Sequence, residues 1–315
     1  MTKYYYTENG VTTTVDGPVK DCWVCMTDPT EEEIRFIADY YHIEDQDDLA
    51  AALDVEESSR IDVEDNYTLI LFDIPTTEVR NEKSRYVTIP LGILTLKDAV
   101  ITVCLEESPV LDFFQNKKAS RIFSTHMKSR FVLQILYHNA KLYLSYLKVI
   151  NRQSEELEKK LHGSTANPTL IDLMELGKSL LYFSTSLKSL NAVLDKLQTS
   201  RAFKKYEEDE ELLEDVIIEC RQALEMSEIY SGLLNGMMDA YASIISNNMN
   251  VVQKFLAVAT IVLSIPNIVS GYYGMNLAAE SIPLATNPYS FWIIIGLSLV
   301  MSVAVWLYFR NKKMF

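Results

Sequence analysis

Residues 255–276 read FLAVATIVLSIPNIVSGYYGMN, and this stretch decides how the chain is organised. No charged side chain occurs from Phe255 to Ala279, and none occurs in residues 281–309, which include the apolar block FWIIIGLSLVMSVAVWLYF at 291–309. A helix needs roughly 20 apolar residues to cross the hydrocarbon core of a bilayer. The blocks Phe255–Tyr273 and Phe291–Phe309, with 19 residues each, therefore predict two membrane-spanning helices. The alternative is a buried helical hairpin in a soluble protein.

The charged residues are distributed unevenly around these two blocks. The 315 residues carry 43 acidic and 29 basic side chains, a net charge of −14, yet Glu280 is the only acid after Gln253. The bases in that region flank the two predicted spans on one side: Lys254, Arg310, Lys312 and Lys313. Because basic residues remain on the cytoplasmic side of a membrane, both ends of the pair are expected in the cytoplasm and residues 276–290 outside. The acidic balance excludes a general nucleic-acid-binding protein, whose phosphate contacts come from Lys and Arg.

The part before the spans divides into two regions. Segments rich in β-branched and aromatic residues predict strands: Asp21–Met26, Tyr67–Ile74, Tyr86–Leu94 and Ala99–Cys104. A capping box at Thr30 and Glu33 predicts a helix through about Tyr41, and a short helix is expected at Asp47–Leu53. These elements indicate an α/β domain.

Long helices are expected after residue 120. Apolar residues at spacings of three and four predict a helix over Arg121–Leu161, and Asn167-Pro168 predicts the start of the next one. A break near Thr199–Lys205 leaves a helix from about Tyr206 to Pro266 that continues into the first span.

One face of the first span is polar or small. Residues of this kind recur at steps of three and four: Asn250, Gln253, Ala257, Thr260, Ser264, Asn267, Gly271 and Gly274. In lipid such a stripe is either a packing seam or the lining of a water-filled pore. Asn and Gln favour a pore, which requires several copies around an axis because one chain supplies one stripe. The second span reads as apolar all round and fits a lipid-facing position.

The sequence carries no signature of an enzyme. Walker loops, GxGxxG after a strand and GxSxG are absent, and the CxxC at Cys22 and Cys25 lacks the second pair that a zinc site needs.

Tyr273-Gly274-Met275-Asn276 closes the first span, and a short loop, a second span and a basic tail follow. This arrangement resembles the CorA family of magnesium channels, whose signature is Gly-Met-Asn at this position. The resemblance covers most of the chain and implies an α+β membrane protein, a funnel-shaped homopentamer in the plasma membrane (the inner membrane in bacteria) with both termini cytoplasmic. It implies six parts: a cytosolic α/β domain at 1–120, long helices including the stalk of the pore helix at 121–254, a pore-lining span at 255–275, an external loop at 276–290, a second span at 291–309 and a basic tail at 310–315.

The resemblance also implies a function and assigns residues to it. The function is electrochemically driven Mg2+ uptake, with Co2+ and Ni2+ as further ions, gated by cytosolic Mg2+. The selectivity filter would consist of Gly274, Met275 and Asn276, and the stripe would line the pore. Many family members carry a bulky apolar residue where this chain has Ser264, so a hydrophobic gate is expected at Leu256 instead, or at Leu263.

The acidic run Glu207–Glu219 contains eight carboxylates and no base. Its ordinary interpretation is a solvated helix face. The resemblance implies instead that Mg2+ bridges neighbouring subunits at Asp215, with Asp239 at the inner pore mouth and Glu280 attracting cations at the outer one. Candidate partner carboxylates on the α/β domain are Asp62, Glu64 and Asp65. The alternatives are a zinc transporter of the same superfamily, whose members usually carry Val in place of Met275, and a membrane-anchored scaffold that conducts nothing.

Overall fold

A computed structural model of the chain describes residues 1–80, 83–115, 123–163, 167–199, 207–276, 283–284 and 287–312. Glu280 and Lys313 lie outside these residues. The chain forms two compact units, Met1–Met237 and Met238–Phe315.

The first unit is built on a seven-stranded sheet with the strand order β2-β1-β3-β7-β6-β5-β4. The strands are β1 (Thr2–Glu8), β2 (Val11–Val15), β3 (Cys22–Thr27), β4 (Arg60–Val63), β5 (Tyr67–Arg80), β6 (Lys83–Leu96) and β7 (Ala99–Cys104). Strands β3 and β7 are parallel, and the other neighbouring pairs are antiparallel.

Short helices cover one face of the sheet: α1 (Glu31–Tyr41), α2 (Asp47–Ala50) and the 3-10 helix η1 (Ala51–Leu53). Apolar residues of these helices share a buried core with Cys22, Val24 and Met26 of β3. Because side chains alternate along a strand, Trp23 lies on the other face, where its ring contacts Phe123 and Phe131.

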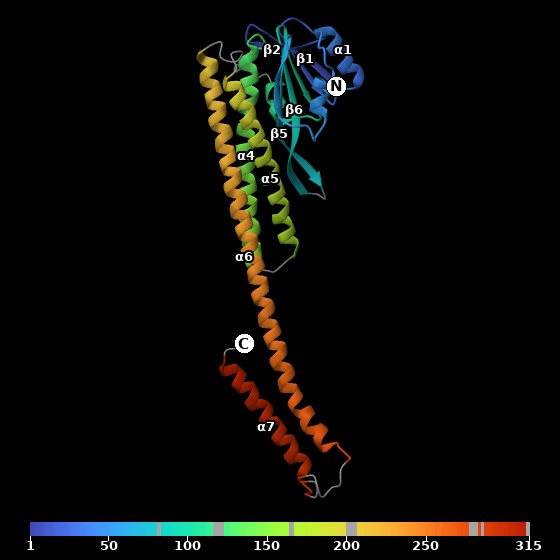
Figure 1. Ribbon diagram of the computed structural model, residues 1–315, viewed down its shortest axis with the longest axis vertical. Coiled ribbons are helices and arrows are strands. Elements are labelled where there is room, and N and C mark those ends of the chain that lie inside the picture. The colour runs from blue at the N-terminus through green and yellow to red at the C-terminus, as the bar shows by residue number, and fades with distance from the viewer. Residues whose placement is uncertain are drawn as a thin grey trace. The chain divides into compact units, whose positions relative to one another are not determined.

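The second face carries three helices: α3 (Pro109–Gln115), α4 (Lys128–Gly163) and α5 (Asn167–Thr199). The first part of α6 (Glu207–Tyr273) packs against α4 and α5. Within this unit α4, α5 and α6 run alongside one another (Figure 1). Ser227 Oγ of α6 donates to the Leu180 carbonyl of α5 at 3.1 Å.

Asp73 of β5 connects the sheet to α4 and α5. Its carbonyl oxygen accepts hydrogen bonds from Asn139 Nδ2 at 3.3 Å and from the Tyr143 hydroxyl at 3.1 Å, while its carboxylate accepts one from Ser186 Oγ. Burial raises the pKa of the Asp73 carboxyl above its usual range, because the charged form loses its hydration.

The second unit consists of the remainder of α6 and helix α7 (Ser290–Asn311), which runs back along α6 (Figure 1). Both helices are long and apolar enough to cross a membrane. The buried residues of α7 are Ser298 and Ser302. The prediction that the second span is apolar all round is therefore wrong: the face that packs on α6 carries two serines.

Several predicted elements are confirmed, including β3, β5, β6, β7 and the two short helices. The capping box is present as predicted, with Glu33 N–H donating to Thr30 Oγ1 and Thr30 N–H donating to the Glu33 carboxylate. Strands β1, β2 and β4 and helix α3 were not predicted.

Two predicted helix boundaries are wrong. Helix α4 begins at Lys128, not Arg121, because the preceding segment is held elsewhere: Phe123 stacks on Phe131, and Thr125 exchanges hydrogen bonds with Thr7 of β1. Helix α6 does not end at Pro266 but continues to Tyr273. Residues 200–206, where the break before α6 was expected, lie outside the described residues.

Candidate ion-conducting face of helix α6

The predicted polar stripe lies on the side of α6 that faces away from α7. Helix α7 packs near Val262, whose carbonyl accepts a hydrogen bond from Ser302, and near Val258, which is only 1% exposed. At 100° per residue, Thr260 and Asn267 lie on the opposite side of the helix. In the single chain the stripe residues are all exposed except Ser264, which is half-buried.

The hydroxyl groups of the stripe are oriented by their own helix. Thr260 Oγ1 donates to the Leu256 carbonyl at 2.8 Å, and Ser264 Oγ donates to the Thr260 carbonyl at 2.7 Å. Since each hydroxyl proton is used within the helix, each oxygen presents acceptor lone pairs outward. Acceptors of this kind suit the water molecules around a hydrated cation, which are hydrogen-bond donors.

Leu256 and Asp239 are also exposed on α6. Leu256 is 56% exposed, and Leu263, the other candidate for a hydrophobic gate, is 69% exposed. Neither fraction favours one leucine over the other, so the gate at Leu256 stays a prediction.

The Gly-Met-Asn triplet forms the turn that ends α6. Gly274 N–H donates to the Ser270 carbonyl at 2.8 Å, and Met275 N–H approaches the Tyr272 carbonyl at 3.4 Å. A Cβ atom at Gly274 would lie 3.1 Å from the Ser270 carbonyl oxygen, so the close turn favours glycine. Met275 and Asn276 are exposed.

The acidic run at the start of α6 is partly neutralised by α4. Glu208 pairs with Arg130, and Glu219 pairs with Lys141. Asp209 is buried, and the loss of hydration raises the pKa of its carboxyl. Asp215 is exposed, and among the described residues no ion pair to its carboxylate is found.

The three candidate partner carboxylates lie close together. Asp62, Glu64 and Asp65 line a cavity of about 190 Å³, and Asp62 pairs with Arg60 at 2.6 Å. Three further acids that the sequence did not single out line the same cavity: Glu44, Asp45 and Asp48. Among the described residues, no three His, Cys, Asp or Glu side chains are placed to hold one metal ion.

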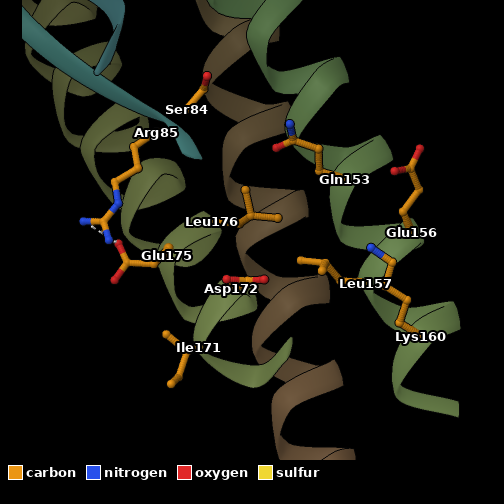
Figure 2. A pocket seen from close by; sticks show the side chains of 10 residues that line it. All are labelled: Ser84, Arg85, Gln153, Glu156, Leu157, Lys160, Ile171, Asp172, Glu175 and Leu176. Carbon is orange, nitrogen blue, oxygen red and sulfur yellow. Dashed lines mark ion pairs between the residues drawn. The ribbon is translucent and has the colours of Figure 1, made fainter. Parts of the chain in front are cut away.

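A larger pocket of about 490 Å³ lies between β6, α4 and α5 (Figure 2). The Arg85 guanidinium points to Glu175 of α5 and pairs with it at 3.0 Å. The other charged residues around the pocket are Glu156, Lys160 and Asp172. Three acids and two bases line the pocket, so most of their charge cancels.

Comparison with known proteins decides between a conducting and a merely anchored membrane protein. Residues 20–312 match the family described as CorA-like Mg2+ transporter protein. The chain belongs to this family. The resemblance that rested on Gly274, Met275 and Asn276 is thereby confirmed for almost the whole length of the chain.

Individual CorA proteins are similar over the same length. The cobalt/magnesium transport protein CorA of Methanocaldococcus jannaschii is 28% identical over 299 residues, 92% of this chain and 90% of that protein. The solved complete structure of the CorA magnesium transporter from the same organism matches with a TM-score of 0.85 and 25% identity, covering 100% of this chain and 99% of the other. The ZntB cytoplasmic domain of Vibrio parahaemolyticus matches with a TM-score of 0.60 over 78% of this chain. At 13% identity this last likeness shows the fold alone.

Proposed function

We propose that the chain forms a homopentameric Mg2+ channel of the CorA type, with α6 lining the pore and α7 outside it. Co2+ and Ni2+ are further permeant ions in this proposal. The observation that carries it is the exposed, uncharged face of α6, which continues through an otherwise apolar span to Gly274, Met275 and Asn276. A single chain supplies only one such face, so several copies must surround a common axis to enclose water.

The chemistry of this face suits a hydrated magnesium ion. Mg2+ binds oxygen in octahedral geometry and gives up its water reluctantly. A ring of Asn276 side chains, together with the carbonyl groups of Gly274 and Met275, offers neutral oxygens that hold the ion through its water shell. Conduction requires binding that is weak enough to release the ion, which a ring of carboxylates would oppose.

The driving force in this proposal is electrochemical. For a divalent cation a membrane potential of 100 mV is worth about 4.6 kcal/mol, twice the value for a single charge. Both termini lie in the cytoplasm in this proposal, which the basic residues flanking the two spans support. Mg2+ bound at Asp215 between neighbouring subunits would close the pore when cytosolic Mg2+ is high. Asp239 would lie at the inner mouth and Glu280 at the outer one.

A matched pair of asparagines tests the pore-lining face. Asn250 lies on the stripe, whereas Asn248, two residues earlier, lies on the other side of the same helix, and both are exposed. We expect Asn250→Ala to lower Mg2+ flux into proteoliposomes and Asn248→Ala to leave it unchanged. Equal effects would contradict the assignment of this face.

The same vesicles separate magnesium from zinc transport. Mg2+ entry under an inside-negative potential, without a proton gradient, supports the proposal. Zn2+ uptake that follows a proton gradient, with no Mg2+ entry, would assign the chain to zinc transport instead. A native mass other than that of five copies would contradict the pentamer.

A further inference from the structure

Pro266 creates a local problem within the first span. Proline has no backbone N–H, so the carbonyl group four residues earlier, that of Val262, loses its donor within the helix. In the hydrocarbon region of a bilayer no water replaces that donor, and an unpaired carbonyl is unfavourable. The helix nevertheless continues for two further turns, to Tyr273.

Helix α7 supplies the missing donor. Ser302 Oγ lies 3.3 Å from the Val262 carbonyl oxygen and donates to it across the two helices. Ser302 is 9% exposed, so this hydrogen bond is shielded by the packed pair.

Other hydroxyl groups in the same unit make the ordinary bond instead. Thr260 and Ser264 donate to carbonyls one turn earlier in α6, and Ser298 donates to the Ile295 carbonyl of α7 at 2.9 Å. Ser298 and Ser302 are one turn apart on the same face, and both are buried. Of these four described hydroxyl groups, only that of Ser302 donates to the other helix, and its acceptor is the carbonyl group that Pro266 leaves without a donor.

We propose that Ser302 is a positioning residue for the pore: its hydroxyl replaces the donor that Pro266 lacks and fixes α7 to α6 at this turn. The turn carries Ser264 and Asn267 on its opposite side, and it precedes the Gly-Met-Asn triplet. This hydrogen bond thus fixes the outer part of the conducting face from the side of α6 that packs on α7. The consequence for transport rests on the proposed function, whereas the hydrogen bond itself does not.

A double-mutant cycle tests the bond independently of transport. Pro266→Ala restores a backbone N–H that bonds to the Val262 carbonyl, so the Ser302 hydroxyl becomes redundant. In the full-length chain in detergent, Ser302→Ala is expected to lower the midpoint of thermal unfolding by about 2 °C, as for the loss of one interhelical hydrogen bond. In the Pro266→Ala background the same substitution is expected to have no effect. Pro266→Leu supplies the same N–H and replaces Pro266→Ala in the cycle if that variant does not fold.

Ser298→Ala is the matched control, because its hydroxyl bonds within α7. Its effect on the midpoint should be the same in the wild-type chain and in the Pro266→Ala background. A Ser302→Ala effect that is equal in both backgrounds, or absent from both, would overturn the proposal.

Flux measurements test the consequence for the pore. Ser302→Ala should lower Mg2+ entry into proteoliposomes severalfold, and Ser302→Thr, which retains the hydroxyl, should restore it. If the thermal coupling is present but Ser302→Ala and wild type conduct equally, the positioning role is wrong. If the wild type conducts no Mg2+ while the coupling persists, the proposed function fails and the hydrogen bond stands.

Discussion

The two units of the chain differ in which side chains they bury. In Met1–Met237 the sheet is covered on both faces, and large side chains such as Trp23, Phe72 and Phe131 are completely buried. In Met238–Phe315 the buried residues among those described are Tyr241, Val258, Ser298 and Ser302. The first unit therefore has a hydrophobic core of its own, whereas the second exposes apolar side chains along both helices.

This difference shows where each unit obtains its stabilising surroundings. Water drives the burial of apolar side chains in the first unit. Lipid is as apolar as leucine, so the second unit gains nothing from hiding its side chains from it and relies on close packing and hydrogen bonds between helices. Among the described residues the polar stripe of α6 is exposed apart from the half-buried Ser264, which is why the proposed channel needs further copies of the chain.

Matched leucine truncations test this contrast most strongly. Leu136 of α4 is completely buried, whereas Leu299 of α7 is 58% exposed. Leu136→Ala should destabilise the protein by about 2–5 kcal/mol, since it leaves a cavity in a packed core. Leu299→Ala should shift the thermal midpoint of the full-length chain in detergent hardly at all. Similar losses for both would mean that the second unit is packed as tightly as the first.

The next largest effect is expected at the turn that ends α6. Gly274→Ala introduces a Cβ atom 3.1 Å from the Ser270 carbonyl and displaces the triplet, so Mg2+ flux should fall about tenfold, as for about 1.4 kcal/mol of lost stabilisation. Gly296→Ala is the control, because a Cβ there meets nothing within 4 Å. Full activity of Gly274→Ala in proteoliposomes would exclude a close turn as a requirement for conduction.

Regulation should depend on the first unit rather than the second. If Mg2+ binds at Asp215, Asp215→Asn should raise the cytosolic Mg2+ concentration that half-inhibits flux by about fivefold, a typical coupling between two sites. The neighbouring Glu214 is also exposed, and Glu214→Gln should leave inhibition unchanged. Unaltered inhibition in Asp215→Asn would refute the regulatory site.

The smallest effect concerns the buried carboxyl group of Asp73. Burial raises its pKa in the folded state above the usual 3.8, so folding is favoured while the group is protonated, and this contribution is lost as the pH rises through the folded-state pKa. Asp73→Asn cannot ionise and should be more stable than wild type at neutral pH, and the difference should shrink as the pH falls to the usual carboxyl pKa and below it. Thermal unfolding across this pH range measures it. A stability difference between the variant and wild type that grows on acidification would contradict a raised pKa of Asp73 in the folded state.

The membrane-spanning unit was the more predictable of the two from sequence. The two long uncharged segments predicted the membrane-spanning part of α6 and helix α7. Polar and small residues spaced three and four apart predicted a face of α6 that the structure leaves mostly exposed. Both signals arise because lipid imposes one uniform environment on a regular helix. The roles of Asn250, Leu256, Asn276 and Asp215 stay predictions.

What could not be predicted depends on contacts between distant segments. Strand β1 contains the run Tyr4-Tyr5-Tyr6, so apolar and polar residues do not alternate regularly along it. Its position in the sheet comes from hydrogen-bonded pairing with β2 and β3. The late start of α4 follows from hydrogen bonds between Thr125 and Thr7. The bond from Ser302 to Val262 likewise joins residues 40 positions apart, although Pro266 was a local signal that a donor is missing.

The central claim is that the outer end of α6 selects and conducts Mg2+. Its most direct test is Mg2+ entry into dye-loaded proteoliposomes under an imposed inside-negative potential, with wild type compared with Asn276→Ala. We expect rapid, potential-driven entry of Mg2+ for wild type and loss of this entry in the variant. Entry that is equally fast in both would contradict a selectivity filter at this triplet, and no entry in either would contradict the channel itself.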